Sequence, residues 1–191
     1  LDGDTSVGSS ITVADADGFV VNDGGTMKTI PATDITTYVG GGITAASQWR
    51  ITADFSGDAT PMINWEVGDT DGYGSIGSAM SESSGIFTFP STGYWLITLF
   101  IKDQNDDDDP YANYSILSTT DDSSYGIAAH AQQGYSGGHY GNASCEFLFD
   151  VTDTTNYKIR FDASNRGANN TVNSGTSWNA TYATFLRLGD T

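Results

Sequence analysis

The most informative part of the chain is Gly85-Ile-Phe-Thr-Phe-Pro-Ser-Thr-Gly-Tyr-Trp-Leu-Ile-Thr-Leu-Phe-Ile-Lys102. It predicts two strands, residues 86–89 and 94–101, because Pro90 presets φ and Gly93 tolerates positive φ in the turn that joins them. The second strand carries large apolar side chains on both of its faces. One face presents Trp95, Ile97, Leu99 and Ile101, and the other presents Tyr94, Leu96 and Phe100.

A strand that is solvated on one side alternates apolar with polar residues, so residues 94–101 must be covered on both sides. Two interpretations stay open. The strand lies in the middle of a sandwich under a long folded loop, or its outer face lies in a subunit interface. The second interpretation predicts interface residues on this strand and on the last strand, residues 180–188. They are Tyr94, Leu96, Phe100 and Phe185.

The composition favours strands and turns over helices, because Gly, Ser, Thr, Asn and Asp are abundant. The chain has 24 acidic residues and only 7 basic ones, which gives a net charge of −17. Nucleic acid is therefore not expected as a partner, since phosphate neutralisation needs Lys and Arg, and anionic membranes are disfavoured for the same reason. No segment has the length of a transmembrane helix, so membrane insertion is not expected either.

Residues 1–42 differ from the rest of the chain and are expected to form a small β-rich segment. Asn22-Asp-Gly-Gly25 predicts a tight turn between two short strands. Residues 31–39 predict one short helix with Thr33 as its N-cap. The segment has too few large apolar residues for a core of its own. We therefore expect it to anchor the protein on a neighbour, on other copies of itself or on a larger assembly.

Residues 43–191 predict an all-β jelly-roll sandwich of about nine to ten strands. Short apolar runs recur there, each bounded by Gly, Asn, Asp or Ser, and no helix pattern interrupts them. The single cysteine, Cys145, lies in one of these runs in phase with Phe147 and Phe149, so it is expected to pack in the core.

The motif Gly85-x-Phe-x-Phe-Pro-x-x-Gly-Tyr-Trp95, followed by an apolar strand, resembles a signature of the globular heads of complement component one q and their tumour-necrosis-factor relatives. Those domains are ten-stranded jelly rolls that form tight trimers. The resemblance covers residues 48–190 and implies a homotrimer. The chain lacks the collagen-like Gly-x-y stalk of complement heads, and its loop before Gly85 is long.

A second resemblance concerns the start and the end of the chain. Residues 17–39 resemble a short module of structural proteins from marine tailed bacteriophages, and Phe185-Leu-Arg-Leu-Gly-Asp-Thr191 resembles their C-terminal ending. This resemblance implies a non-enzymatic fibre, spike or capsid-surface protein, located on the virion surface and bound to other virion proteins through residues 1–42. The alternatives are a secreted cellular adhesin or lectin with the same fold and, ranked last, a fibre-borne glycan depolymerase.

The most pointed polar run is Asp103-Gln-Asn-Asp-Asp-Asp-Asp109. Its alternating residues could supply oxygen ligands to calcium, the one cofactor that the sequence suggests. It is not an EF-hand, because Asp108 stands where Gly is required and Tyr114 stands where the bidentate Glu belongs. The alternative is a solvated acidic turn. The candidate ligands are Asp103, Asn105, Asp107 and Asp109.

Two loops near the end of the chain are rich in Tyr, Trp, Asn, Gly and Ser, which suits recognition of a host-surface glycan through aromatic stacking and hydrogen bonds. The candidate ligand-binding residues are Tyr135, His139, Tyr140 and Trp178. Ordinary jelly-roll loops have a similar composition. No nucleophile elbow or phosphate loop occurs, so no catalytic residue is assigned.

Overall fold

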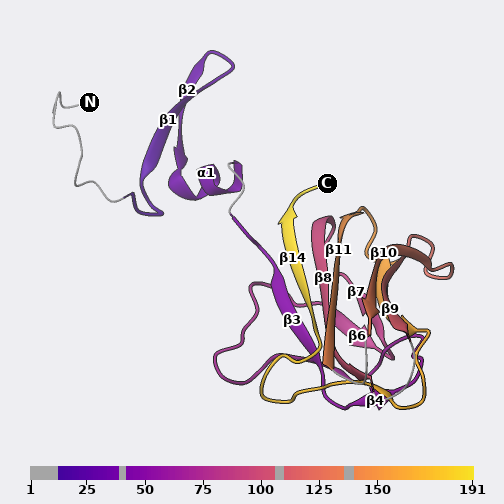
Figure 1. Cartoon of the computed structure of the whole chain (residues 1–191). Coiled ribbons are helices and arrows are strands. Elements are labelled where there is room, and N and C mark those ends of the chain that lie inside the picture. The colour runs from indigo at the N-terminus through magenta and orange to yellow at the C-terminus, as the bar shows by residue number, and fades with distance from the viewer. Residues whose placement is uncertain (1–12, 39–41, 106–109, 136–139) are drawn as a thin grey trace. The chain divides into compact units, whose positions relative to one another are not determined.

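The computed structural model describes residues 13–38, 42–105, 110–135 and 140–191 of the 191-residue chain. The chain divides into two compact units, Leu1–Gly42 and Ile43–Thr191, drawn in Figure 1. Within the described residues, no helix is long and apolar enough to cross a membrane.

The N-terminal unit is a β-hairpin followed by one short helix. Strands β1 (Gly18–Asp23) and β2 (Thr26–Pro31) pair antiparallel, and α1 spans Ala32–Tyr38. The Asn22 side chain accepts a hydrogen bond from the Gly25 amide at 2.7 Å, and Gly24 and Gly25 have φ of 59° and 93°, as a tight hairpin turn requires.

The predicted helix is present, but the prediction of Thr33 as its N-cap is wrong. The Ala32 amide donates to the Asp17 carbonyl at 2.8 Å, which ties the start of α1 to the chain just before β1. The helix therefore begins directly after β2, and Thr33 lies inside its first turn.

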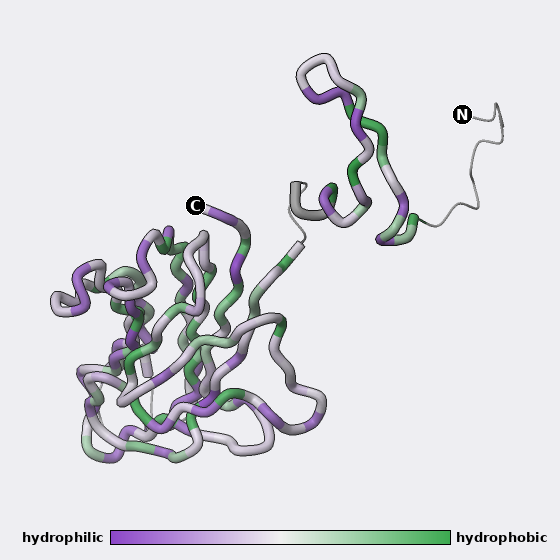
Figure 2. The backbone as a smooth tube through the Cα atoms, turned by 180° about the vertical axis from the view of Figure 1, so that it is seen from behind, coloured by the Kyte–Doolittle hydropathy of each residue, from purple (hydrophilic) through white to green (hydrophobic). Residues whose placement is uncertain are grey.

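The described residues of the hairpin unit are mostly exposed. Among its described residues Ala32 is the buried one, whereas Phe19, Val20 and Met27 are exposed. Apolar stretches of the hairpin are visible in green in Figure 2. A lone two-stranded hairpin is marginally stable in water, so this unit gains stability only by packing on something further.

The C-terminal unit is a sandwich of two antiparallel sheets, which confirms the predicted all-β jelly roll. The seven-stranded sheet has the order β4 (Phe55–Ser56), β13 (Asn170–Val172), β8 (Gly93–Asn105), β14 (Tyr182–Gly189), β3 (Ala46–Ile51) and β5 (Trp65–Val67), and β11 (Tyr140–Val151) also pairs with β8. The five-stranded sheet has the order β10 (Gly126–Gly134), β9 (Tyr111–Thr119), β12 (Lys158–Ser164), β7 (Ile86–Thr88) and β6 (Ser81–Ser83).

Strand β8 lies in the middle of the larger sheet and pairs with β14 along one side and with β11 along the other. The two predicted faces of this strand are present: Trp95, Ile97, Leu99 and Ile101 are buried between the sheets, whereas the side chains of the outward face are half-buried or exposed. The described part of the sandwich contains twelve strands rather than nine or ten. The additional ones, such as β6 and β13, are three residues long and too short to show a period-2 pattern.

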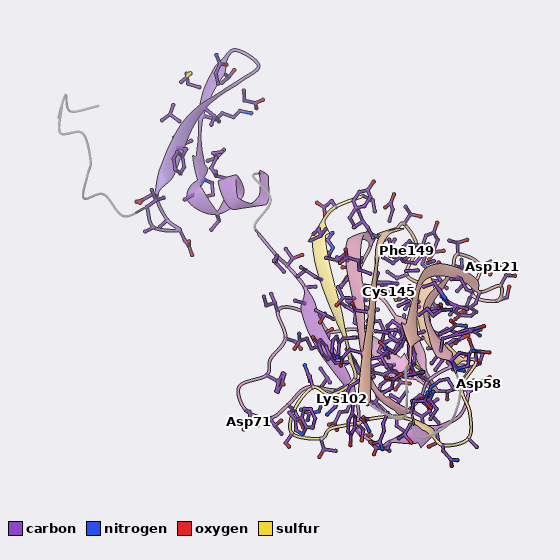
Figure 3. The ribbon with its side chains drawn as sticks, in the orientation of Figure 1. Asp58, Asp71, Lys102, Asp121, Cys145 and Phe149 are labelled. Atoms are coloured by element: carbon purple, nitrogen blue, oxygen red, sulfur yellow. The ribbon has the colours of Figure 1, made fainter. Side chains whose placement is uncertain are left out.

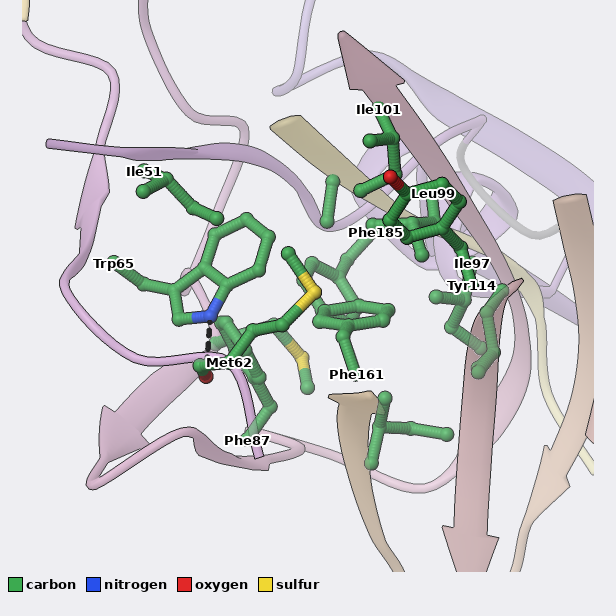
Figure 4. Close-up of a cluster of buried hydrophobic side chains, with 14 of the residues drawn as sticks. Ile51, Met62, Trp65, Phe87, Ile97, Leu99, Ile101, Tyr114, Phe161 and Phe185 are labelled. Atoms are coloured by element: carbon green, nitrogen blue, oxygen red, sulfur yellow. Dashed lines mark hydrogen bonds between the residues drawn. The ribbon is translucent and has the colours of Figure 1, made fainter. Parts of the chain in front are cut away.

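The core lies between the sheets and is rich in aromatic rings (Figure 4). Phe87, Phe161 and Phe185 meet at its centre, and the ring centroids of Phe87 and Phe185 are 5.0 Å apart. The prediction of Phe185 as an interface residue is therefore wrong, because Phe185 is 0% exposed on the inward face of β14. Cys145 packs against the rim of the same core, as expected.

Candidate functional site

Three leucines lie side by side on the face of the larger sheet that points away from the core. In the register of β14, β8 and β11, Leu186 pairs with Leu96, and Leu96 pairs with Leu148. We call these three residues the leucine row. Leu96 and Leu186 are half-buried, and Leu148 is 54% exposed. Tyr94 extends this apolar patch on the outward face of β8.

A second group lies further along the same outward face. Here Tyr182 pairs with Phe100, and Phe100 pairs with Ser144. The rings of Phe100 and Tyr182 stack, with centroids 5.3 Å apart and planes at 28°. They border a hollow of about 430 Å³, which we call the aromatic hollow. Its outward-facing lining residues are Thr98, Phe100, Ser144, Glu146 and Tyr182.

Lys102 follows Phe100 on the outward face and lies between two aromatic side chains. Its ammonium nitrogen is 4.9 Å from the ring centroid of Trp178 and 5.7 Å from that of Tyr140. Trp178 is 51% exposed and Tyr140 is 69% exposed. The structure thus brings together two of the predicted ligand-binding residues, around a lysine that the sequence did not single out. Figure 3 shows Lys102 and Cys145 on the neighbouring strands β8 and β11.

The other two predicted ligand-binding residues do not join this group. His139 lies outside the described residues. Tyr135 is half-buried, and its hydroxyl donates a hydrogen bond to Oδ2 of Asp103, whose side chain is inside the sandwich. Tyr135 therefore belongs to the interior polar network rather than to an exposed recognition loop.

Asp103 is the centre of this interior network. It is 0% exposed, and its Oδ2 accepts hydrogen bonds from the hydroxyls of Tyr114 and Tyr135. Burial, reinforced by the hydrogen bond to Asp103, raises the pKa of Tyr135 to about 12. Burial also raises the pKa of Tyr114 far above its ordinary value, against the opposing charge of Arg166. The Arg166 guanidinium in turn donates to the backbone carbonyl of Asn170 at 2.7 Å.

This geometry bears on the predicted calcium ligands. Asp103 and Asn105 are both buried on the inward face of β8, and Asp107 and Asp109 lie outside the described residues. Within the described part of the chain, no group of three or more His, Cys, Asp or Glu side chains could hold a metal ion. Calcium binding by residues 103–109 stays a prediction.

One row of the smaller sheet carries a serine, a histidine and an aspartate. Ser115 Oγ is 3.1 Å from Nδ1 of His130, and the backbone of Ser115 pairs with that of Asp162 on the other side. A catalytic triad needs the imidazole between the nucleophile and the carboxylate, whereas here the serine is in the middle. Ser115 is also buried. This row has the wrong order for nucleophilic catalysis.

Of the leucine row, the sequence predicts Leu96 as an interface residue but neither Leu186 nor Leu148. Leu148 lies in the exposed phase of β11, together with the polar residues Ser144, Glu146 and Asp150. An apolar residue in an otherwise polar phase was the available signal. The sequence predicts a core role for the opposite phase, with Cys145, Phe147 and Phe149, and assigns no role to Leu148.

No protein-family model matches the sequence, and no curated protein matches it. Among solved structures, Eiger TNF from S. frugiperda is similar, with a TM-score of 0.59 and 11% identity over 78% of this chain and 95% of that chain. Murine APRIL at pH 5.0 is similar with a TM-score of 0.58 and 12% identity, over 75% of this chain and 98% of that chain. The sandwich therefore has a jelly-roll fold of the tumour-necrosis-factor type, which confirms the first resemblance at the level of fold. Neither structure bears on the resemblance to bacteriophage proteins.

Proposed function

We propose that this chain is a non-enzymatic structural protein whose jelly-roll unit assembles into a homotrimer through the leucine row. The supporting observation is that Leu186, Leu96 and Leu148 lie on adjacent strands in register, on the face of the sheet that points away from the core. A contiguous apolar patch on the outside of a soluble domain typically marks a protein contact. The number of copies comes from the resemblance of residues 48–190 to complement heads, which form tight trimers.

The predicted interface residues divide between two parts of the outward face. Tyr94 and Leu96 belong to the apolar end with the leucine row. Phe100 is four residues further along β8, about 13 Å away at the rise of a strand, and lines the aromatic hollow instead. The leucine row, rather than Phe100, therefore forms the centre of the proposed contact.

The charge of the chain sets how assembly depends on salt. Glu146 and Asp150 are exposed on β11, on either side of Leu148, and each copy carries a net charge of −17. Bringing three copies together therefore costs electrostatic repulsion, which salt screens. We expect the trimer to be tighter at about 0.5 M salt than at about 0.02 M, since the Debye length shortens as salt is added.

The test is the mass in solution by light scattering. We expect three times the 20.2 kDa of one chain for the wild type and the mass of one chain for Leu148→Asp. The matched control is Ile127→Asp, which also replaces an exposed aliphatic side chain with a carboxylate. Ile127 is 66% exposed and lies on β10 of the other sheet. A wild type with the mass of a single chain, or a trimeric Leu148→Asp, would refute the proposal.

The role in a particle rests on the N-terminal unit. With only Ala32 buried among its described residues and apolar side chains exposed on the hairpin, this unit needs a partner to be stable. We assign it the anchoring contact with other virion proteins, and we assign the jelly roll to the virion surface, where it attaches to a host glycan. A gene neighbourhood of capsid and tail genes would support this assignment. A secretory signal in the gene, upstream of residue 1, would favour a cellular adhesin instead.

A further inference from the structure

The aromatic hollow has the size of a binding site for a small ring-shaped ligand, and the rings of Phe100 and Tyr182 line it. Its volume of about 430 Å³ falls in the usual range of ligand pockets, roughly 300–1,000 Å³. The stacked rings of Phe100 and Tyr182 are half-buried, so part of each ring stays open toward the solvent. Aromatic faces of this kind pack against the C–H face of a sugar ring.

The wall of the hollow is polar, which argues against a purely apolar ligand. Thr98, Ser144 and Glu146 supply two hydroxyls and a carboxylate. In the part of the chain that the structure describes, none of these three side chains forms a hydrogen bond. Hydroxyls both donate and accept, and a carboxylate accepts, so together they match the hydroxyl groups of a saccharide.

A positive charge, that of Lys102, lies beyond the hollow on the same outward face. Lys102 is two residues beyond Phe100 on the same face, about 7 Å along the strand. Its ammonium is held beside Trp178 and Tyr140, and it forms no ion pair within the described residues. In a chain with 24 acidic and 7 basic residues, a lysine kept between two exposed aromatic rings is free to pair with an anionic group of a ligand.

We propose that the aromatic hollow and Lys102 form a binding site for a saccharide that carries a carboxylate, such as a uronic acid residue. One sugar ring packs on Phe100 and Tyr182, its hydroxyls bind Ser144 and Glu146, and the carboxylate pairs with Lys102. The net charge of −17 and Glu146 repel long polyanions, so the match is to a short, hydroxyl-rich acidic oligosaccharide rather than to a long acidic polymer. This inference rests on the attachment role proposed above and names its ligand class.

The experiment measures the affinity of the full chain for trigalacturonic acid and for a neutral galactose trisaccharide by titration calorimetry. The wild type is expected to bind the acidic trisaccharide more tightly. Lys102→Gln should weaken that binding about tenfold, the loss of one charge-assisted contact, and leave the neutral trisaccharide unaffected. The matched control is Lys158→Gln, which makes the same change in net charge on β12 of the other sheet and should alter neither affinity.

A second variant tests the aromatic floor. Phe100→Leu keeps an apolar side chain but removes the stacked ring, so it should weaken both trisaccharides. The inference is overturned if the wild type binds neither saccharide, or if Lys102→Gln and Lys158→Gln have equal effects. Light scattering on the same samples separates the two proposals. If the protein is a trimer but binds no saccharide, only the saccharide site is refuted. If it is a single chain that binds the acidic saccharide, only the proposed trimer is refuted.

Discussion

Replacing Tyr114 with Phe tests whether the interior polar network stabilises the sandwich. The change removes one hydroxyl, which donates to Oδ2 of Asp103. A hydrogen bond to a charged group contributes about 1.5–3 kcal/mol to the free energy of unfolding. We expect about 2 kcal/mol or more, because Asp103 is fully buried, its Oδ1 has no partner among the described residues, and only Tyr135 would still donate to Oδ2.

Urea unfolding and thermal melting followed by circular dichroism measure this loss. For a chain of this length, about 2 kcal/mol lowers the melting temperature by about 4–8 °C. Wild type and variant are compared at one protein concentration, because assembly makes the apparent stability depend on concentration.

The matched control is Tyr157→Phe, which removes a hydroxyl that accepts a bond from the exposed Thr152 at 3.0 Å. An exposed bond of this kind exchanges readily with water, so the control should change the free energy of unfolding by less than about 0.5 kcal/mol. The reasoning is refuted if Tyr114→Phe is no more destabilising than Tyr157→Phe.

The pKa of Tyr135 is raised from 10.0 to about 12, and that of Tyr114 is raised as well, so the folded state keeps protons that the unfolded state loses. Their contribution to stability is therefore complete below pH 10 and lost as the pH rises toward 12; a urea midpoint that is constant from pH 9 to pH 12 would contradict this. Arg50→Leu should cost about 2 kcal/mol in urea unfolding, because the buried guanidinium pairs with two carboxylates, at 2.7 Å and 2.8 Å; an unchanged midpoint would mean that these pairs contribute nothing. Phe185→Ala should cost about 3–5 kcal/mol as a core truncation, and a cost below about 1 kcal/mol would be incompatible with its burial. Calcium bound at residues 103–109 should raise the melting temperature over that in chelator, and equal values in the two buffers would remove this prediction.

Much of the fold could be predicted from local patterns. The alternation in β8, the turn at Asn22 and the short strands after residue 43 all depend on residues close in sequence, and each is present. The boundary of the two units also falls where the glycine-rich stretch ends. Short strands such as β6 and β13 were not predicted, because three residues are too few to show an alternating pattern. Their positions are set by the strands that they pair with.

The candidate site was predicted only in part. Tyr140 and Trp178 were chosen by composition and do lie together, but Lys102, the residue that joins them, was visible only in three dimensions. Tyr135 comes from the same loop composition as Tyr140, yet its hydroxyl lies in the interior, because a loop composition does not specify the direction of a side chain.

The sequence alone was enough to predict that both faces of β8 are apolar, since side-chain direction alternates along any strand. For the last strand, residues 180–188, it could not decide which face is the core, and so Phe185 was placed on the wrong side of its sheet. Nor could it place Leu148 abreast of Leu96, because that pairing depends on the register between strands far apart in the chain. Register is a property of the assembled sheet. It is set when all the strands bury their inward faces together, and only the tertiary structure contains that information.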